Sequence, residues 1–129
     1  MPGRRIAIVE DDNAISLLLR YNLEMAGYAV ESFENGAVAL DHVLDDPPDL
    51  LLLDWVLPDR SGLELLREVR RRAHTRALPV VMVTARSDRS DSERALDHGV
   101  DAYFTKPFSV AAVLKTIESL LRPATQPAR

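Results

Sequence analysis

The chain has 129 residues, no cysteine and a formal net charge of -4 at pH 7. This length fits one domain, and the lack of cysteine excludes disulfides, a thiol nucleophile and cysteine-ligated zinc. Acidic and basic residues are mixed along most of the chain, which argues against a dedicated polyanion binder. No apolar run approaches the ~20 residues of a membrane span, and no secretion-type hydrophobic region follows the start, so we expect a cytoplasmic protein without membrane contact.

Hydrophobic periodicity predicts five strands that alternate with five helices. The strands are predicted at residues 6–9, 28–33, 50–53, 79–83 and 101–105, and the helices begin near residues 13, 37, 61, 87 and 110. Such alternation favours right-handed crossovers and an α/β fold with a parallel sheet covered on both faces. We expect one domain over residues 1–122, followed by a tail or the start of a linker at residues 123–129.

The predicted helices differ in how much apolar surface they offer. In the first helix Leu18 and Leu19 recur at helical spacing and predict the buried face. The fifth helix has the cleanest apolar stripe of the chain. The fourth helix, at residues 87–98, offers little beyond Ala95 and Leu96, and its first part is rich in Ser and Asp. We therefore expect the fourth helix to be the least firmly held.

Residues 49–58, Asp-Leu-Leu-Leu-Leu-Asp-Trp-Val-Leu-Pro, are the stretch around which the chain is arranged. Four consecutive leucines indicate a strand buried on both faces, and they carry Asp54 to its C-terminal end. Pro58 then favours a loop. Because ligands bind at that end of an open parallel sheet, Asp54 is either a reactive group or the N-cap of the next helix, and the stretch alone leaves both interpretations open.

Polar groups also follow the other predicted strands. They are Glu10, Asp11 and Asp12 after the first strand, Thr84 after the fourth and Lys106 after the fifth. All are expected at the same sheet edge as Asp54. Crowded carboxylates repel unless a cation lies among them, and Mg²⁺ prefers oxygen ligands. A cation, an aspartate, a hydroxyl group and a lysine are the parts that stabilise a phosphoryl group passing to a carboxylate.

Four motifs carry a resemblance to a known family. They are Ile-Val-Glu-Asp-Asp, Leu-Asp-Trp-Val-Leu-Pro, Val-Thr-Ala-Arg and Tyr-Phe-Thr-Lys-Pro-Phe, in that order. Each alone is weak, but together they are highly specific, and over residues 4–122 the chain resembles the receiver domain of two-component response regulators. The resemblance implies a flavodoxin-like (βα)5 doubly wound sandwich with a five-stranded parallel sheet in the order 2-1-3-4-5.

The resemblance also implies a role for each residue at the sheet edge. Asp54 would accept a phosphoryl group from a histidine kinase or a phosphotransfer protein. Mg²⁺ would be held by Glu10 through water, by Asp11, by Asp54 and by the backbone carbonyl of Val56. Thr84 and Lys106 would contact the phosphoryl oxygens, and the Lys106-Pro107 peptide bond would be cis. Such a domain assists its own phosphorylation and slow dephosphorylation and is not a turnover enzyme.

A switch and a subclass follow from the same resemblance. Phosphorylation would draw the Thr84 hydroxyl toward the phosphate, turn the Tyr103 ring inward and remodel the face made by the fourth helix, fifth strand and fifth helix. Val56 and Arg86 occupy positions that tune the phosphoryl lifetime, and the apolar Val56 side chain predicts slow self-dephosphorylation. The motifs look most similar to receivers of the OmpR/PhoB winged-helix regulators.

That subclass forms activated dimers through charged pairs, which this chain lacks. It has Ala102, Ala112 and Thr116 at positions where charged residues are usual. The missing pairs would remove register and specificity more than affinity, so a hydrophobic or differently registered homodimer stays open.

Three other functions remain as alternatives. An aspartate-nucleophile phosphohydrolase would use the same intermediate, but Val56 stands where a second acid is needed two residues after Asp54. The chain could also be the receiver part of a DNA-binding regulator, although we expect no direct nucleic-acid contact by this domain. A flavodoxin-like cofactor binder is disfavoured because the first loop is acidic where a phosphate cradle needs glycine.

Several other residues have simpler expected roles. Trp55 is expected to be a partly exposed neighbour of the site. The histidines are expected at the surface rather than in a phosphorelay. The basic stretch is expected to be a solvated helix face, and it consists of Arg67, Arg70, Arg71, Arg72 and Arg76.

Overall fold

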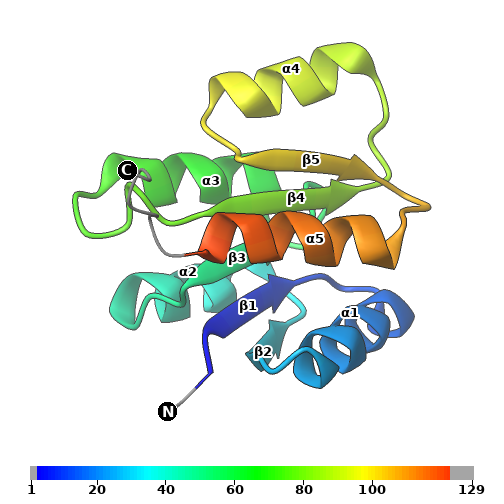
Figure 1. Cartoon of the computed structure of the whole chain (residues 1–129). Helices are drawn as coiled ribbons and strands as arrows, with labels where there is room; N and C mark the ends of the chain where they lie inside the picture. Colours follow the sequence, from blue (N-terminus) through cyan, green and yellow to red (C-terminus); the bar gives the residue numbers. More distant parts are fainter. Residues whose placement is uncertain (1–2, 123–129) are drawn as a thin grey trace, which may run out of the picture.

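The computed structural model describes residues 3–122 as strands and helices in strict alternation (Figure 1). The elements are β1 (Arg5–Val9), α1 (Asn13–Met25), β2 (Ala29–Phe33), α2 (Gly36–Asp45), β3 (Leu50–Leu53), α3 (Gly62–Arg71), β4 (Val80–Thr84), α4 (Arg89–Asp97), β5 (Ala102–Thr105) and α5 (Val110–Leu121). The tail predicted at residues 123–129 lies outside the described residues. Within residues 3–122, no helix combines the length and the apolarity that crossing a membrane requires.

The five strands form one parallel sheet in the order β2-β1-β3-β4-β5, which confirms the predicted topology. Every leucine of β3 is buried, and their side chains alternate between the two faces of the sheet. Leu51 and Leu53 pack with α2 and α3, whereas Leu50 and Leu52 pack with α1 and α5. The four-leucine run is therefore apolar throughout because helices cover both faces of the central strand.

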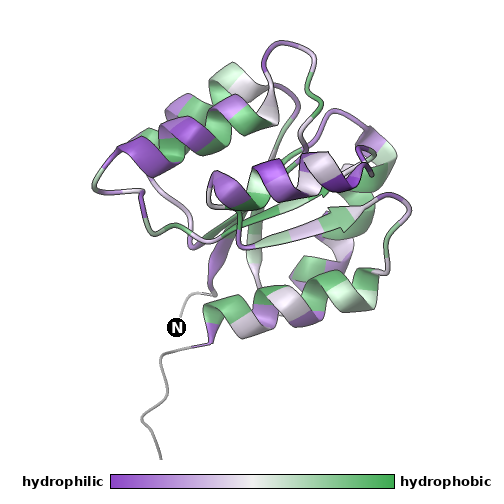
Figure 2. Cartoon of the chain, turned by 90° about the horizontal axis from the view of Figure 1, so that it is seen from above, coloured by the Kyte–Doolittle hydropathy of each residue, from purple (hydrophilic) through white to green (hydrophobic). Residues whose placement is uncertain are grey.

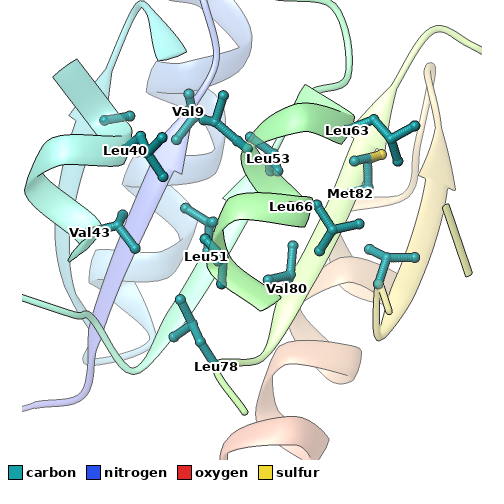
Figure 3. Packing of buried hydrophobic residues seen from close by; sticks show 14 of the residues in the cluster. Val9, Leu40, Val43, Leu51, Leu53, Leu63, Leu66, Leu78, Val80 and Met82 are labelled. Carbon is teal, nitrogen blue, oxygen red and sulfur yellow. The ribbon is translucent and has the colours of Figure 1, made fainter. Parts of the chain in front are cut away.

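The helices form two layers, one on each face of the sheet (Figure 1). On one face α2, α3 and α4 enclose a core with β1, β3 and β4, in which Leu63 and Leu66 of α3 lie close to Val80 and Met82 (Figure 3). On the other face α1 and α5 cover the sheet. The second core places Ile117 of α5 fully out of contact with solvent.

The apolar face of α1 differs in part from the prediction. Leu19 and Leu23 are buried, but Leu18 is 45% exposed. Leu17, Tyr21 and other large side chains also face solvent. The helix α1 has two apolar faces, one packed on the sheet and one uncovered. The helical spacing of its apolar residues therefore does not decide which face is buried.

The fourth helix is held by very little apolar surface, as the sequence predicted. Its single buried residue is Ala95, and Leu96 is 53% exposed. Seen from the side on which α4 lies nearest the viewer, α4 is mainly hydrophilic, whereas α5 is largely hydrophobic (Figure 2). By contrast α3 buries Leu63, Leu65 and other apolar residues. The two neighbouring helices thus differ sharply in how they are anchored.

Candidate functional site

Three carboxylates meet where β1 and β3 end. Glu10 follows β1 directly and Asp54 follows β3 directly, because these parallel strands are neighbours with their carboxyl ends at the same edge. Carboxylate oxygens of Glu10, Asp11 and Asp54 lie within 4.8 Å of one another. Glu10 and Asp54 are almost fully buried, while Asp11 is exposed. The structure thus brings together three of the four carboxylates that the strand-end pattern placed at one edge, while the fourth, Asp12, caps α1 instead.

Lys106 lies between the two buried carboxylates. It follows β5 directly, and its Nζ is 2.8 Å from Asp54 Oδ2 and 2.9 Å from Glu10 Oε1. Its backbone N–H donates to the carbonyl of Thr84, which ties the loop after β5 to the end of β4. The peptide bond that joins it to Pro107 is cis. One ammonium group therefore offsets part of the negative charge of this edge.

Burial and neighbouring charges shift the pKa values of Glu10 and Lys106. Burial raises the pKa of Glu10, and the Asp54 carboxylate adds to that rise against the hydrogen bonds from Lys106 and the Asp12 N–H. Burial alone would lower the pKa of Lys106, but its hydrogen bonds to Asp54 and Glu10 hold that pKa above the ordinary value. The site consequently has more carboxylates than ammonium groups, so negative charge is in excess.

The donor set fits a hard divalent cation. It consists of carboxylate oxygens only, two of them on buried residues that have already lost their hydration. Mg²⁺ binds through one or two carboxylates and keeps several waters, and the exposed Asp11 leaves the site open to solvent for them. No cysteine occurs in the chain, so a thiolate site for a softer metal is excluded.

The loop after Asp54 folds back onto the carboxylate. The N–H of Val56 donates to Asp54 Oδ1 at 3.0 Å, and Val56 forms an isolated bridge with Ser61. The Val56 side chain is 54% exposed, so it lines the entrance without offering a polar group. A shallow cavity of about 380 Å³ opens beside the loop, between Val56 and Arg86. One Asp54 oxygen is thus held by the backbone and the other by Lys106.

Thr84, Arg86 and Tyr103 form a chain of contacts behind the carboxylates. Thr84 is fully buried at the end of β4, and its Oγ1 accepts a long hydrogen bond of 3.4 Å from the Arg86 N–H. The Tyr103 hydroxyl donates to the Arg86 carbonyl at 2.6 Å. Burial raises the pKa of the Tyr103 phenol, and Asp91 raises it further. The structure therefore joins Tyr103 to Thr84 through the backbone of Arg86.

The prediction for Trp55 was wrong. Its side chain is only 5% exposed and belongs to the core under α2, α3 and α4. The guanidinium carbon of Arg86 lies 4.5 Å from the ring centre and that of Arg94 lies 5.9 Å away. Two cations from the β4–α4 region thus cover the ring, an environment that the sequence around Trp55 could not reveal.

The basic stretch is not uniformly a solvated helix face. Arg70 is largely buried and donates to the carbonyls of Gly99, Arg76 and Leu78. It also pairs with Asp101 at 3.1 Å. Arg70 therefore joins the end of α3 to the loop between α4 and β5. Arg71 and Arg72 instead pair with Glu68 on their own helix.

The histidines lie at or near the surface, as predicted, and each has a local partner. His42 contacts Glu31 at 3.3 Å. His74 contacts the Leu44 carbonyl, and His98 contacts the Arg94 carbonyl.

Asp59 has a role that sequence reasoning missed. Its two oxygens accept the N–H groups of Gly36 and Ala37 at 2.7 and 2.9 Å. These hydrogen bonds lower the pKa of Asp59. The partners are more than 20 residues apart in the chain, so no local pattern indicates the contact.

An apolar stripe on α1 begins next to this edge of the sheet. It is formed by Leu17, Leu18, Tyr21 and Met25, each between 45% and 72% exposed. The N-cap of α1 is Asp12, whose carboxylate accepts from the N–H groups of Ala14 and Ile15. The stripe thus continues away from the carboxylate cluster along the outer side of α1.

Comparisons with known proteins agree on one family. The family model described as the response regulator receiver domain matches residues 6–118. The chain is 45% identical over 120 residues to the phosphate regulon transcriptional regulatory protein PhoB of Rhizobium meliloti, covering 93% of this chain and 53% of that protein. It therefore spans about half the length of the curated relatives that it matches.

Solved structures show the same fold. A CheY-like response regulator receiver domain protein from Methanospirillum hungatei superposes with a TM-score of 0.86 at 33% identity, over 92% of this chain and 94% of that one. The receiver domain of a sensor histidine kinase from Pseudomonas aeruginosa, with magnesium coordinated in its active-site cleft, gives 0.84 at 28% identity, over 92% and 98% of the two chains.

Proposed function

Because the chain belongs to the response regulator receiver domain family, we propose that Asp54 accepts a phosphoryl group from a histidine kinase or a phosphotransfer protein and that this modification switches the domain. The observation that carries the proposal is the arrangement around Asp54. One oxygen is held by the Val56 N–H and the other by Lys106, within a cluster of three carboxylates. This set of groups matches the demands of phosphoryl transfer better than those of a helix cap.

In the transfer, a P–N bond to the donor histidine breaks and a P–O bond to an Asp54 oxygen forms, while the released imidazole nitrogen takes up a proton. Lys106, already 2.8 Å from Asp54 Oδ2, stabilises the charge on the phosphoryl oxygens. Asp11, Asp54 and the Val56 carbonyl would hold Mg²⁺, with Glu10 acting through water, and the bound ion would neutralise part of the crowded negative charge. The exposed apolar Val56 side chain gives an attacking water no partner, so self-dephosphorylation is slow.

The modification is read out through the contacts behind the site. The Thr84 hydroxyl moves toward the phosphoryl group and the Tyr103 ring turns inward, which changes the face made by α4, β5 and α5. The chain of bonds from Thr84 through Arg86 to Tyr103 supports this path. The weak anchoring of α4 supports it too, because elements that switch come from the low-stability parts of a fold.

The phosphodonor docks on the outer face of α1. An exposed stripe of large apolar side chains marks an interaction surface, and this one leads to the acidic edge that carries Asp54. A helix of a kinase or phosphotransfer protein that covers the stripe would bring its histidine to the site. The cytoplasmic location stays a prediction.

Receiver domains are signalling domains, and the lack of an acid at Val56 disfavours a turnover phosphohydrolase. The PhoB relatives are transcriptional regulators, and this chain covers about half their length. Control of transcription through a DNA-binding output domain therefore stays a proposal for a longer protein. Dimerisation through α4, β5 and α5 is also a proposal. Size-exclusion chromatography with and without a phosphoryl mimic tests it.

Mass spectrometry of the intact protein tests the phosphoacceptor role. After incubation with a small phosphodonor and Mg²⁺, the wild-type protein should gain about 80 Da, one phosphoryl group. Asp54→Asn should gain nothing, because an amide cannot accept the group. A control, Asp41→Asn on the exposed side of α2, should react like the wild type. An adduct that survives Asp54→Asn, or no adduct at all, would disprove the proposal.

A further inference from the structure

Arg86, in the loop between β4 and α4, contacts several separate parts of the molecule. Its guanidinium covers the Trp55 ring at 4.5 Å. Its Nε and Nη2 donate to the two oxygens of Asp91 at 3.1 and 3.2 Å. Its backbone N–H reaches the Thr84 hydroxyl, and its carbonyl accepts from Tyr103. One residue thus touches the neighbour of Asp54, the switch hydroxyl, the switch tyrosine and the first turn of α4.

The first turn of α4 has no side-chain cap, and Arg86 contacts it through Asp91. The N-cap side chains of the other four helices each accept a backbone N–H, and they are Asp12, Asn35, Ser61 and Ser109. The N-cap of α4, Asp88, makes no such bond in the described structure. Asp91, in that first turn, is nevertheless only 14% exposed because Arg86 covers it. The contact with Arg86 therefore ties the first turn of α4 to the loop before it, although it does not accept a backbone N–H as a cap would.

The two ends of α4 are held in different ways. At the C-terminal end, Arg70 donates to the Gly99 carbonyl through Nε and Nη2, at 3.0 and 2.7 Å. Arg70 comes from the firmly packed α3 and has no contact with the phosphorylation site. At the N-terminal end, the holding residue is Arg86, which is bonded to Thr84. The N-terminal attachment is thus bonded to Thr84 and stacked on Trp55, the residue that follows Asp54 in the chain.

We propose that Arg86 is a latch, a positioning residue whose guanidinium, held between Trp55 and Asp91, keeps the first turn of α4 docked until Asp54 is phosphorylated. The coupling part of this inference rests on the proposed function. When the Thr84 hydroxyl moves toward a phosphoryl group, its long bond to the Arg86 N–H is lost. The loop then shifts, the stacking on Trp55 breaks, and α4 pivots about its Arg70 attachment.

Thermodynamic linkage between the docking of α4 and the phosphorylation of Asp54 sets the direction in which a broken latch acts. If phosphorylation favours the released state, a broken latch must make occupation of Asp54 more favourable by the same factor that the latch contributes. A cation–π contact from a partly exposed arginine and a partly exposed ion pair together correspond to about a 3- to 10-fold change in an equilibrium constant. The latch is therefore strong enough to bias α4 and weak enough for one phosphoryl group to release it.

The latch itself is tested without any phosphodonor. Arg86→Gln, Asp91→Asn and the double variant are compared with Arg89→Gln, which removes an exposed ion pair to Glu93 on the same helix. Trp55 is the only tryptophan of the chain, so acrylamide quenching reports on its cover. We expect greater quenching and faster hydrogen exchange in residues 89–94 for both single variants. The double variant should add little beyond Arg86→Gln, because Arg86→Gln already removes the ion pair that Asp91→Asn breaks. Wild-type behaviour, or the same change in Arg89→Gln, would overturn the latch.

Coupling to Asp54 is tested with beryllofluoride and Mg²⁺, a mimic of the phosphoryl group. Arg86→Gln, which removes both contacts, should bind it about 3- to 10-fold more tightly than Arg89→Gln does, and Asp91→Asn, which removes only the ion pair, should bind it more tightly by a smaller factor. Equal affinities would overturn the coupling. If the wild-type protein fails to bind the mimic while the quenching results hold, the proposed function fails and the latch stands as a structural contact.

Discussion

The helices α3 and α4 lie in the same layer of the molecule but are attached by opposite means. α3 buries Gly62, Leu63, Leu65, Leu66 and Val69. α4 buries Ala95 alone and is held at its ends by arginines, Arg86 at the start and Arg70 at the finish. Apolar packing is non-directional and has no alternative arrangement of similar energy, whereas ion pairs and cation–π contacts can be exchanged. The attachment of α4 thus depends on charged contacts, whereas the attachment of α3 depends on buried apolar surface.

The largest effect should come from removing apolar packing under α3. Leu66→Ala should lower the free energy of unfolding by about 2–5 kcal/mol, because Leu66 is fully buried and its truncation leaves a cavity. Leu96→Ala on α4 should cost less than about 0.5 kcal/mol, because Leu96 is mostly exposed. Urea denaturation of both variants measures the difference. Similar losses of unfolding free energy in the two variants would mean that apolar packing holds α4 as firmly as α3.

A smaller effect should come from the C-terminal attachment of α4. Gly99 has φ +98°, and a Cβ there would lie 2.9 Å from Arg70 Nε. Gly27 has nearly the same φ, +99°, but open space around it. Gly27→Ala should cost about 1–2 kcal/mol through backbone strain, and Gly99→Ala up to about 3 kcal/mol, since Arg70 must also shift. Thermal unfolding compares them. Equal costs would show that Arg70 adjusts freely.

The smallest effect concerns the loop that leads into α3. The hydrogen bonds from Gly36 and Ala37 hold the pKa of Asp59 below 3.8, its value without these contacts. Asp59 therefore contributes stability above that pH, and the contribution disappears as the pH falls through the lower, folded-state pKa. In Asp59→Asn the unfolding free energy should fall less steeply between neutral and acidic pH. An unchanged slope in denaturation curves across pH 2–7 would contradict this assignment.

The strand-end residues show how far the sequence could predict the site. Glu10, Asp54 and Lys106 each follow an apolar strand directly, so parallel topology alone brings them to one edge. The weak packing of α4 could also be predicted, because it follows from the few apolar residues within the helix itself.

The contacts that the sequence did not reveal all join distant segments. Trp55 is buried in the apolar core and lies under Arg86 and Arg94, and neither arginine is near it in the chain. The sequence does not distinguish Arg70 from a surface arginine, because the backbone carbonyls that it bonds come from other segments. Leu18 follows a helical spacing, but α1 has two apolar faces and only the tertiary structure decides between them.

Peptide-resolved hydrogen exchange, before and after phosphorylation of Asp54 with a small phosphodonor and Mg²⁺, tests most directly that the site is read out through the loosely held helix. The account predicts faster exchange in residues 89–97 of α4 and altered exchange around Tyr103 in β5, with no change in residues 62–71 of α3. The same treatment of Asp54→Asn should leave both helices unchanged. Unaltered exchange in α4 of the phosphorylated protein, or an equal change in α3, would contradict it.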